Sequence, residues 1–473
     1  MIHFGTGGWR AIIGDEFTKA NIQLVAKAVA QRIKDEKVDQ LPVIVGYDRR
    51  FLSREAMIWI GEVLASNGIK AMLVGESSPT PLIMYYTMVH HLKYGMMVTA
   101  SHNPSLYNGI KVITEEGRDA NETVTGDLEQ RIRNISENDT TAPVRSIEEL
   151  KEEGLIVFFN PIDEYLDAIL GKIDVFAIRN AHLRIAIDPL YGVSMRSLNT
   201  IFSTARCDIH MLHAEHDTLF AGKMPSPDES TVRTLQNYVT DYKFDMGIAT
   251  DGDADRIGLI DDEGRYITAN EILCILYYYF LEYKGMRTPV VKNLATTTLL
   301  NKIAQAYGQT CYEVPVGFKH ISAKMAETGA YIGGESSGGL TVMGHINGKD
   351  AIYAASLLVE TIAKTGKKPS LLMKEVSDRF GSYKTCECNV TFHEDRKQGL
   401  INRIYAQHDI PDFGLKIISE SYEDGCKVQF EDGWILIRFS GTEPLLRIFC
   451  EFPEDQYSEA ERLCQAVRDY YEI

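Results

Sequence analysis

Short apolar runs alternate with longer helical segments through about three quarters of the chain. Apolar runs of this length are typical of strands covered on both faces, and the helices between them supply the crossovers. The first run of the alternation predicts strands at 42–47, 71–74 and 94–99, with helices at 53–67 and 81–91. Ser53 is the expected N-cap of the first helix, and Gly68 its C-terminal stop. The fold class is therefore α/β with mixed or parallel sheets.

The same alternation returns twice, which indicates three successive similar α/β domains. A chain of 473 residues is too long for one core. The last hundred residues differ, because strands joined by tight turns at 416–451 precede a closing helix at 455–471, as in a small α+β domain. The expected helices of the middle units include 195–205, 229–242 and 350–364. The predicted domains are 1–150, 158–267, 268–370 and 371–473.

Composition excludes several classes of function. A formal net charge of −17 argues against broad binding to nucleic acid or to anionic membranes, which needs a positive surface. The longest apolar run, 272–281, is too short to span a bilayer, and the N-terminus carries no signal pattern. The eight cysteines are scattered, without zinc spacing or a dense disulfide framework. We expect a cytoplasmic protein with reduced thiols.

The strand at 94–99 ends abruptly in the polar stretch Thr99-Ala100-Ser101-His102-Asn103-Pro104. Strand tips are where α/β proteins place their chemistry. A hydroxyl at Ser101, an imidazole at His102 and an ammonium at Lys111 could serve as nucleophile, base and charge clamp. An ordinary polar turn is the alternative that these residues alone leave open.

Three carboxylates follow another strand, at Asp251, Asp253 and Asp255. Alternating positions of an extended segment project to one side, and three carboxylates together need a divalent cation such as Mg²⁺, Mn²⁺ or Ca²⁺ to offset their repulsion. An EF-hand is excluded because Arg256 and Asp262 occupy the positions that need glycine and glutamate. Arg256 would offset charge or hold an anion. A solvated acidic turn is the alternative.

The glycine-rich run 333–339 permits two interpretations. Gly334 to Gly338 matches G-x-S-x-G, which would make Ser336 the nucleophile of a serine hydrolase. Such an elbow must pass directly into a helix, and the residues that follow are not helical in pattern. A loop presenting Glu335 and Ser337 to hydroxyl groups is therefore preferred, with His345 and Lys349 just beyond it.

Two further stretches suit an anion. At the C-terminal end, Arg438 and Arg447 offer bidentate donors around a turn that contains Ser440, Gly441 and Thr442. Near the N-terminus, Arg10 follows a glycine-rich segment that fits neither a Walker loop nor a dinucleotide fingerprint. Each stretch taken singly is also compatible with a surface turn.

These features in this order resemble the α-D-phosphohexomutase superfamily, which includes phosphoglucomutases and phosphomannomutases. The resemblance covers essentially the whole chain and implies four domains in a heart-shaped molecule around a central cleft. It implies that Ser101 is the phosphorylated serine and that Ser101, Asp251, Asp253 and Asp255 hold one Mg²⁺. The resemblance also implies charge and proton transfer by Arg10, His102, Lys111 and Lys349, and substrate binding by Arg256, Lys319, Glu335, Ser337, His345, Arg438, Ser440, Gly441, Thr442 and Arg447.

The implied reaction interconverts hexose 1-phosphate and hexose 6-phosphate through a 1,6-bisphosphate, which also serves as activator. Small sugar phosphates would be the only partners of a monomer or homodimer, with no nucleic acid and no membrane. The general base is open between Lys111, His102 and Lys349.

Departures from the family pattern favour the phosphoglucomutase-like branch and hence glucose. Gly339 stands where some mannose/glucose enzymes have histidine. The segments 344–350 and 314–319 resemble phosphoglucomutase segments, the first without the usual glutamate before the lysine. Alternatives of the same fold are a phosphomannomutase, a phosphoglucosamine or phosphopentose mutase, or a glucose 1,6-bisphosphate synthase. A non-catalytic sugar-phosphate-binding protein is the alternative from a different class.

Overall fold

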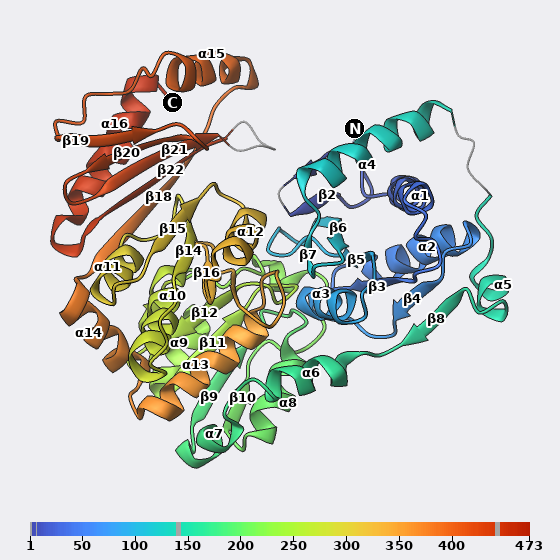
Figure 1. Cartoon of the computed structure of the whole chain (residues 1–473), viewed down its shortest axis with the longest axis horizontal. Helices are drawn as coiled ribbons and strands as arrows, with labels where there is room; N and C mark the ends of the chain where they lie inside the picture. The colour runs from blue at the N-terminus through green and yellow to red at the C-terminus, as the bar shows by residue number, and fades with distance from the viewer. Residues whose placement is uncertain (1, 6, 139–142, 440–444) are drawn as a thin grey trace. The chain divides into compact units, whose positions relative to one another are not determined.

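A computed structural model describes residues 2–5, 7–138, 143–439 and 445–473 (Figure 1). The chain forms two compact units. The first consists of Met1–Ala269 with Ser337–Ser370, and the second of Asn270–Ser336 with Leu371–Ile473. Among the described residues, no helix is long and apolar enough to cross a membrane.

A mixed sheet forms the N-terminal part of the first unit. The parallel strands β5, β3, β4 and β8 lie side by side, and β6 and β2 continue the sheet in antiparallel pairing. β8 joins this sheet from beyond the polar stretch at 115–153. The strands are β1 (Phe4–Gly5), β2 (Gly8–Ile12), β3 (Val43–Tyr47), β4 (Ala71–Val74), β5 (Tyr94–Val98), β6 (Tyr107–Thr114), β7 (Arg118–Asp119) and β8 (Ile156–Phe159).

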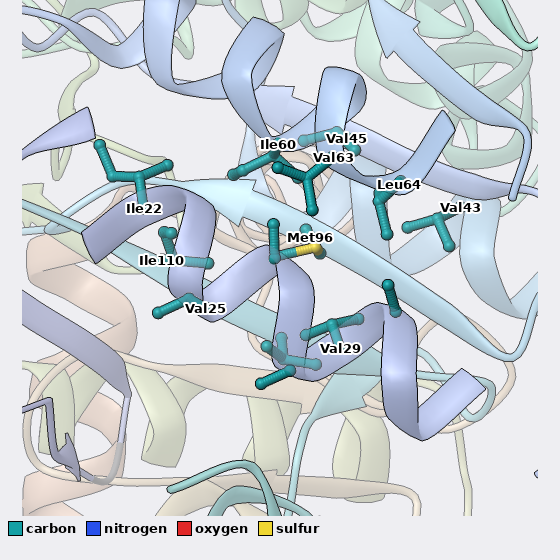
Figure 2. Packing of buried hydrophobic residues seen from close by; sticks show 14 of the residues in the cluster. Ile22, Val25, Val29, Val43, Val45, Ile60, Val63, Leu64, Met96 and Ile110 are labelled. Carbon is teal, nitrogen blue, oxygen red and sulfur yellow. The ribbon is translucent and has the colours of Figure 1, made fainter. Parts of the chain in front are cut away.

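Helices cover both faces of this sheet. α1 (Lys19–Asp35) packs against α2 (Ser53–Ser66) and α4 (Glu122–Glu137), and α3 (Thr80–Val89) packs against β3 and β5. Figure 2 shows apolar side chains of α1 and α2 meeting those of β3, β5 and β6 in one cluster. Val43 and Val45 of β3 belong to this cluster, whereas Ile44 lies near Ile83 of α3. The alternation places one core on each face of the sheet.

A second sheet follows in the same unit. β9 (Arg184–Asp188) pairs in parallel with β10 (Asp208–Met211) and β11 (Met246–Thr250), and β12 (Ile257–Ile260) and β13 (Tyr266–Ile267) continue it in antiparallel pairing. The helices of this region are α6 (Ile162–Leu170), α7 (Val175–Ala181), α8 (Met195–Thr204), α9 (Arg233–Tyr242) and α13 (Ala351–Thr365), the last packing against α7, α8 and β12. The short helix α5 (Ile147–Glu152) packs instead against α2 and β8 of the first sheet. The short strand β17 (Leu340–Val342) precedes α13.

The second unit contains two further sheets. β14 (Val290–Asn293) lies between the parallel strands β15 (Cys311–Val314) and β16 (Ile332–Gly334), with helices α10 (Ala269–Tyr278), α11 (Leu299–Ala306), α12 (Phe318–Thr328) and α14 (Pro369–Phe380). The C-terminal sheet is antiparallel throughout, in the order β18-β22-β21-β20-β19. Its elements are β18 (Tyr383–Thr391), β19 (Ile417–Ser421), β20 (Cys426–Phe430), β21 (Trp434–Phe439), β22 (Leu445–Pro453), α15 (Lys397–Ile401) and α16 (Tyr457–Tyr471).

The α/β fold class with mixed sheets and a C-terminal α+β region is confirmed, but some local predictions are wrong. Leu52, with φ +63°, is the N-cap of α2, and the Ser53 hydroxyl donates instead to Asp48 Oδ1 at 2.8 Å. A buried carboxylate needs donors more than an exposed helix end does. The helix predicted from residue 229 begins at Arg233, because Thr231 and Asp228 form a turn before it. The strand β18 was not predicted.

We expect Leu64→Ala to lower the free energy of unfolding by about 2–5 kcal/mol, because it opens a cavity in the α1–α2 core. Leu64 is fully buried there. The measurement is urea unfolding followed by circular dichroism. Leu106→Ala is the matched control, since that side chain is 50% exposed and the same atoms are removed at little cost. Equal midpoints for the two variants would contradict the packing described here.

Candidate active site

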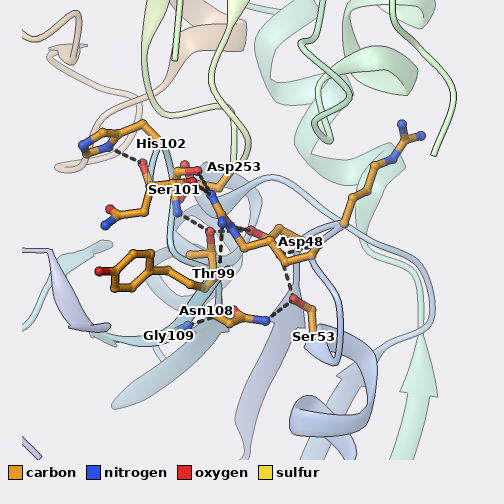
Figure 3. A network of polar contacts seen from close by, with 12 residues as sticks. Asp48, Ser53, Thr99, Ser101, His102, Asn108, Gly109 and Asp253 are labelled. Carbon is orange, nitrogen blue, oxygen red and sulfur yellow. Dashed lines mark hydrogen bonds and ion pairs between the residues drawn. The ribbon is translucent and has the colours of Figure 1, made fainter. Parts of the chain in front are cut away.

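Ser101 lies just beyond the end of β5, in a backbone conformation that only strong local contacts maintain. Its φ is +52°, in the left-handed region that is costly for a residue with a side chain. The Ser101 N–H donates to Thr99 Oγ1 at 2.8 Å, and the Thr99 hydroxyl donates to Asp48 Oδ2 at 2.6 Å (Figure 3). These bonds hold the turn to the tip of the neighbouring strand β3.

The Arg50 side chain holds the same loop by hydrogen bonds to its backbone. Its buried guanidinium donates to four backbone carbonyls of the loop, those of Ser101 (2.6 Å), Asn103 (2.6 Å), Pro104 (2.8 Å) and Tyr107 (3.0 Å). Arg50 Nε lies 3.3 Å from Asp48 Oδ2, so a carboxylate balances the buried charge. The loop that presents Ser101 is therefore held through its backbone.

The three aspartates follow β11 in a turn that closes on itself and on Ser101. Asp251 Oδ1 accepts the backbone N–H groups of Asp255 (2.9 Å) and Arg256 (3.0 Å). The Ser101 hydroxyl donates to Asp251 Oδ2 at 2.7 Å. A Cβ on Gly252 would lie 2.8 Å from the Ser101 carbonyl oxygen, so only glycine permits this approach of the two loops.

The aspartate cluster fits a divalent cation. One ligand oxygen from each of Asp251, Asp253 and Asp255 lies within 4.8 Å of the others, and all three residues are fully buried. Asp253 Oδ1 and Asp255 Oδ1 have no hydrogen-bond partner among the described residues. Buried carboxylate oxygens are normally paired, and all-oxygen donors suit Mg²⁺, Mn²⁺ or Ca²⁺. These three residues could hold a metal ion.

Ammonium groups balance the remaining oxygens. Lys111 Nζ on β6 donates to Asp253 Oδ2 (2.7 Å) and Asp255 Oδ2 (2.8 Å), and Lys349 Nζ lies 3.1 Å from Asp255 Oδ2. Burial alone would lower the pKa of Lys111, but Asp253 and Asp255 reverse this and raise it, so the ammonium stays protonated. Burial, reinforced by its two neighbouring aspartates, raises the pKa of Asp251 well above its ordinary value.

His102 faces a different electrostatic environment. Its Nδ1 lies 3.4 Å from Ser101 Oγ. The positive charge of Arg256, then burial and the charges of Arg10 and Lys349, lower the pKa of His102 far below its ordinary value. The imidazole is therefore neutral and a weak base. Arg10 itself donates to the side-chain oxygen of Asn103 in the loop.

The first unit thus brings together predicted site residues from well-separated segments of the sequence: Arg10, Ser101, His102, Lys111, Asp251, Asp253, Asp255, Arg256 and Lys349. His345 is buried in the same unit, where its Nε2 lies 2.6 Å from Asp350 Oδ2 and the Tyr165 hydroxyl donates to that oxygen at 2.8 Å. Asp350 Oδ1 also caps α13. This network supports the segment that carries Lys349.

The other predicted residues are distributed between the units. Ser337 belongs to the first unit, whereas Lys319, Glu335, Arg438 and Arg447 belong to the second. There Asn293 Nδ2 donates to Glu335 Oε2 at 3.4 Å, and Arg438 Nε donates to Asp424 Oδ1 at 2.9 Å. Ser440, Gly441 and Thr442 lie outside the described residues. The binding roles of all these residues stay predictions.

Two positioning residues, Asp48 and Arg50, were missed from the sequence. Both follow β3 directly, and β3 is the parallel neighbour of β5. Charged residues at the ends of adjacent parallel strands meet at one edge of a sheet, and that signal could have identified them. The hydrolase elbow at Ser336 is not formed, because a turn and the strand β17 follow it where a helix is required.

Comparisons with known proteins find the same family in each of four successive segments of the chain. Profiles of the phosphoglucomutase/phosphomannomutase α/β/α domains I, II and III match residues 1–139, 163–264 and 268–380, and that of the C-terminal domain matches 387–470. A phosphoglucomutase/phosphomannomutase of Thermococcus kodakarensis is 30% identical over 456 residues, covering 96% of this chain and 95% of that protein.

Two further relatives differ in their sugar. A phosphoglucosamine/phosphogalactosamine mutase of Sulfurisphaera tokodaii is 27% identical over 463 residues, covering 96% of this chain and 95% of that protein. A solved structure from Thermus thermophilus, described as a phosphomannomutase, is 26% identical with a TM-score of 0.86, covering 100% of this chain and 99% of that one. The reaction type is common to these relatives, and the sugar is not.

We expect Asp253→Asn to weaken binding of a divalent cation at least about 100-fold, because ligand loss costs more than the 10–100-fold typical of supporting residues. Isothermal titration with Mg²⁺ after chelation measures this. Glu263→Gln, an exposed neighbour in sequence, is the control and should bind like the wild type. Since the cation competes with a proton on Asp251, affinity should fall as the pH drops through the raised pKa of that carboxyl. Unchanged binding by Asp253→Asn would remove the metal site.

Proposed function

The chain belongs to the phosphoglucomutase/phosphomannomutase family, an enzyme family of intramolecular phosphotransferases, and we propose that it interconverts glucose 1-phosphate and glucose 6-phosphate. One observation carries the proposal. The Ser101 hydroxyl lies 2.7 Å from the carboxylate of Asp251, within a cluster that offers a cation two further carboxylate oxygens with no hydrogen bond from any described residue. A phosphorylated Ser101 would stand beside that cation.

Ser101 acts as the acceptor and donor of the phosphoryl group. Phosphoserine 101 transfers its phosphoryl to the free hydroxyl of a hexose phosphate, which loses its proton, and the product is a hexose 1,6-bisphosphate. The bisphosphate turns over and returns its other phosphoryl to the Ser101 oxygen, and the released sugar hydroxyl regains a proton. Mg²⁺ held by Asp251, Asp253 and Asp255 would neutralise charge on the phosphoryl group in transit. A bisphosphate lost midway leaves Ser101 unmodified, so added hexose 1,6-bisphosphate acts as activator.

The protonation states assign roles to the groups around Ser101. His102 is neutral and adjacent to the Ser101 oxygen, where it can hydrogen-bond a reacting hydroxyl, although its lowered pKa makes it a weak base. Lys111 is protonated and acts by charge, together with Lys349 and Arg256. The loop clamp by Arg50 keeps the serine oxygen aimed at the acidic cluster.

We choose glucose as the sugar for two reasons. The segments 314–319 and 344–350 resemble those of phosphoglucomutases, and Gly339 stands where some mannose/glucose enzymes have histidine. The second candidate is glucosamine phosphate, since a relative of 27% identity is a phosphoglucosamine/phosphogalactosamine mutase. We propose the cytoplasm as the site of action, because the eight cysteines all lie in the described part of the chain and all are free thiols.

Ser101→Ala should reduce turnover at least about 10³-fold, because the group that carries the phosphoryl is gone. A coupled assay with glucose 1-phosphate measures turnover, and intact mass reports phosphate on the native protein. Ser105→Ala, in the same loop, is the control and should keep both turnover and the phosphorylated fraction. Turnover by Ser101→Ala near the wild-type rate would refute Ser101 as the nucleophile.

Sugar preference is tested on a panel of 1-phosphates of glucose, mannose, glucosamine and ribose. We expect the largest kcat/KM for glucose 1-phosphate, by at least about tenfold, which corresponds to ~1.4 kcal/mol of differential transition-state binding. A larger kcat/KM for glucosamine 1-phosphate would support the second candidate activity instead, and the role of Ser101 would be unchanged.

A further inference from the structure

A cavity of about 720 Å³ lies in the first unit, and the supporting residues Asp48 and Arg50 are among those that line it. It is bounded by the segment between β3 and α2, the loop after β4, and the start of α8 with residues 216–218. Neither Ser101 nor any of the three aspartates lines it. Its volume is within the range of sites that enclose small organic ligands. The phosphoryl transfer proposed above makes no use of it.

Cationic side chains gather around this cavity although the chain carries a net charge of −17. Arg49, Arg54 and Arg196 line it, together with Arg50, which is paired with Asp48. Arg196 pairs with Glu76, but the Arg49 guanidinium donates to the backbone carbonyls of Ala214 (2.9 Å) and Glu215 (3.2 Å). Arg54 is exposed and lies near Tyr47.

The carboxylates of the lining offset these cations only in part. Asp48 is occupied by the hydroxyls of Ser53 and Thr99, and Glu76 by Arg196. Glu55 is the remaining acid of the lining. An anionic ligand would therefore meet two guanidiniums, that of Arg49, which donates to two backbone carbonyls, and that of the exposed Arg54. Guanidinium forks of this kind are suited to phosphate.

Part of the remaining lining is apolar, which suits a ligand with an organic body. Phe51 is 56% exposed, although large apolar side chains are normally buried. Val193 and Met195 also line the cavity. Leu52, next to Phe51, has a φ of +63°, a costly conformation for this residue type. Exposed aromatic surface and local strain together are typical of binding sites.

The two sides of the cavity connect to the two catalytic loops. On one side, Arg50 and Asp48 hold the Ser101 loop through its carbonyls and Thr99. On the other side, the Val193 N–H donates to the Gly252 carbonyl at 3.2 Å in the aspartate loop. The adjacent Ser194 hydroxyl bonds the Thr250 hydroxyl at 2.7 Å, just before Asp251. A ligand that bridges the cavity would change the spacing of the serine and the metal cluster.

We propose that this cavity binds a small organic phosphate with an apolar body, of which nucleoside phosphates are an example, and that its occupancy adjusts the catalytic rate. The phosphate lies between Arg49 and Arg54, and the body lies against Phe51. The ligand contacts residues that do not take part in phosphoryl transfer. It acts on the reaction only through the positions of the two loops.

The test is isothermal titration of the full chain with AMP, and separately with inorganic phosphate. Wild type should bind AMP at least about tenfold more tightly than inorganic phosphate, since the body adds contact area. Arg54→Ala should weaken AMP binding at least about tenfold, as expected for loss of a charge-assisted hydrogen bond. Arg133→Ala removes an exposed arginine on α4, away from the cavity, and should bind AMP like the wild type.

A further variant separates this cavity from the active site. Asp251→Asn alters the catalytic centre and should keep full AMP affinity. Binding that is lost in Asp251→Asn and kept in Arg54→Ala would overturn the proposal, as would no binding to wild type or equal affinity for AMP and inorganic phosphate. Saturating AMP should also change kcat at saturating substrate at least about twofold in wild type and not in Arg54→Ala. An unchanged kcat would overturn the regulatory part, whether or not the substrate assignment holds.

Discussion

The mutual repulsion of three buried carboxylates is the constraint on which the first unit depends. Asp251, Asp253 and Asp255 are fully buried, with ligand oxygens within 4.8 Å of one another. Like charges so close in a low-dielectric interior are stable only when opposite charge lies beside them. Lys111 from β6 and Lys349 from the segment before α13 provide it, and the two oxygens that accept no hydrogen bond in the described part of the chain are available to a cation. The need for charge balance thus brings β6 and the segment before α13 to the aspartate loop after β11.

Contacts to the backbone also position the two loops of this site. Four carbonyls of the Ser101 loop converge on one guanidinium, and Gly252 allows the aspartate loop to approach that loop closely. The cost of the left-handed conformation at Ser101 is offset by these bonds. A strained residue held in this way keeps its hydroxyl in one direction, which phosphoryl transfer requires. Asp48 and Arg50, which support the Ser101 loop, also line the cavity described above, so the active site and that cavity have supporting residues in common.

Local pattern was sufficient for some parts of the molecule and not for others. The buried strands β3, β4 and β5 were predicted from apolar runs, because burial on both faces leaves a pattern in the sequence. β18 has an exposed face with alternating cysteine and polar residues, and that mixture concealed it. The capping rule points to Ser53 because it considers only the nearest N–H groups, whereas a carboxylate five positions earlier competes for the Ser53 hydroxyl.

The sequence by itself determined the α/β character of the chain, the turn that groups three aspartates, and the serine at a strand tip, because each depends on residues that are close neighbours along the chain. Only the tertiary structure decided that Ser101 and Asp251, separated by 150 positions, share a hydrogen bond. It also decided that Arg50 supports the Ser101 loop, that Lys111 is protonated and that His102 is neutral. The physical reason is that burial and electrostatic fields are sums over neighbours in space, which no local pattern of residues records.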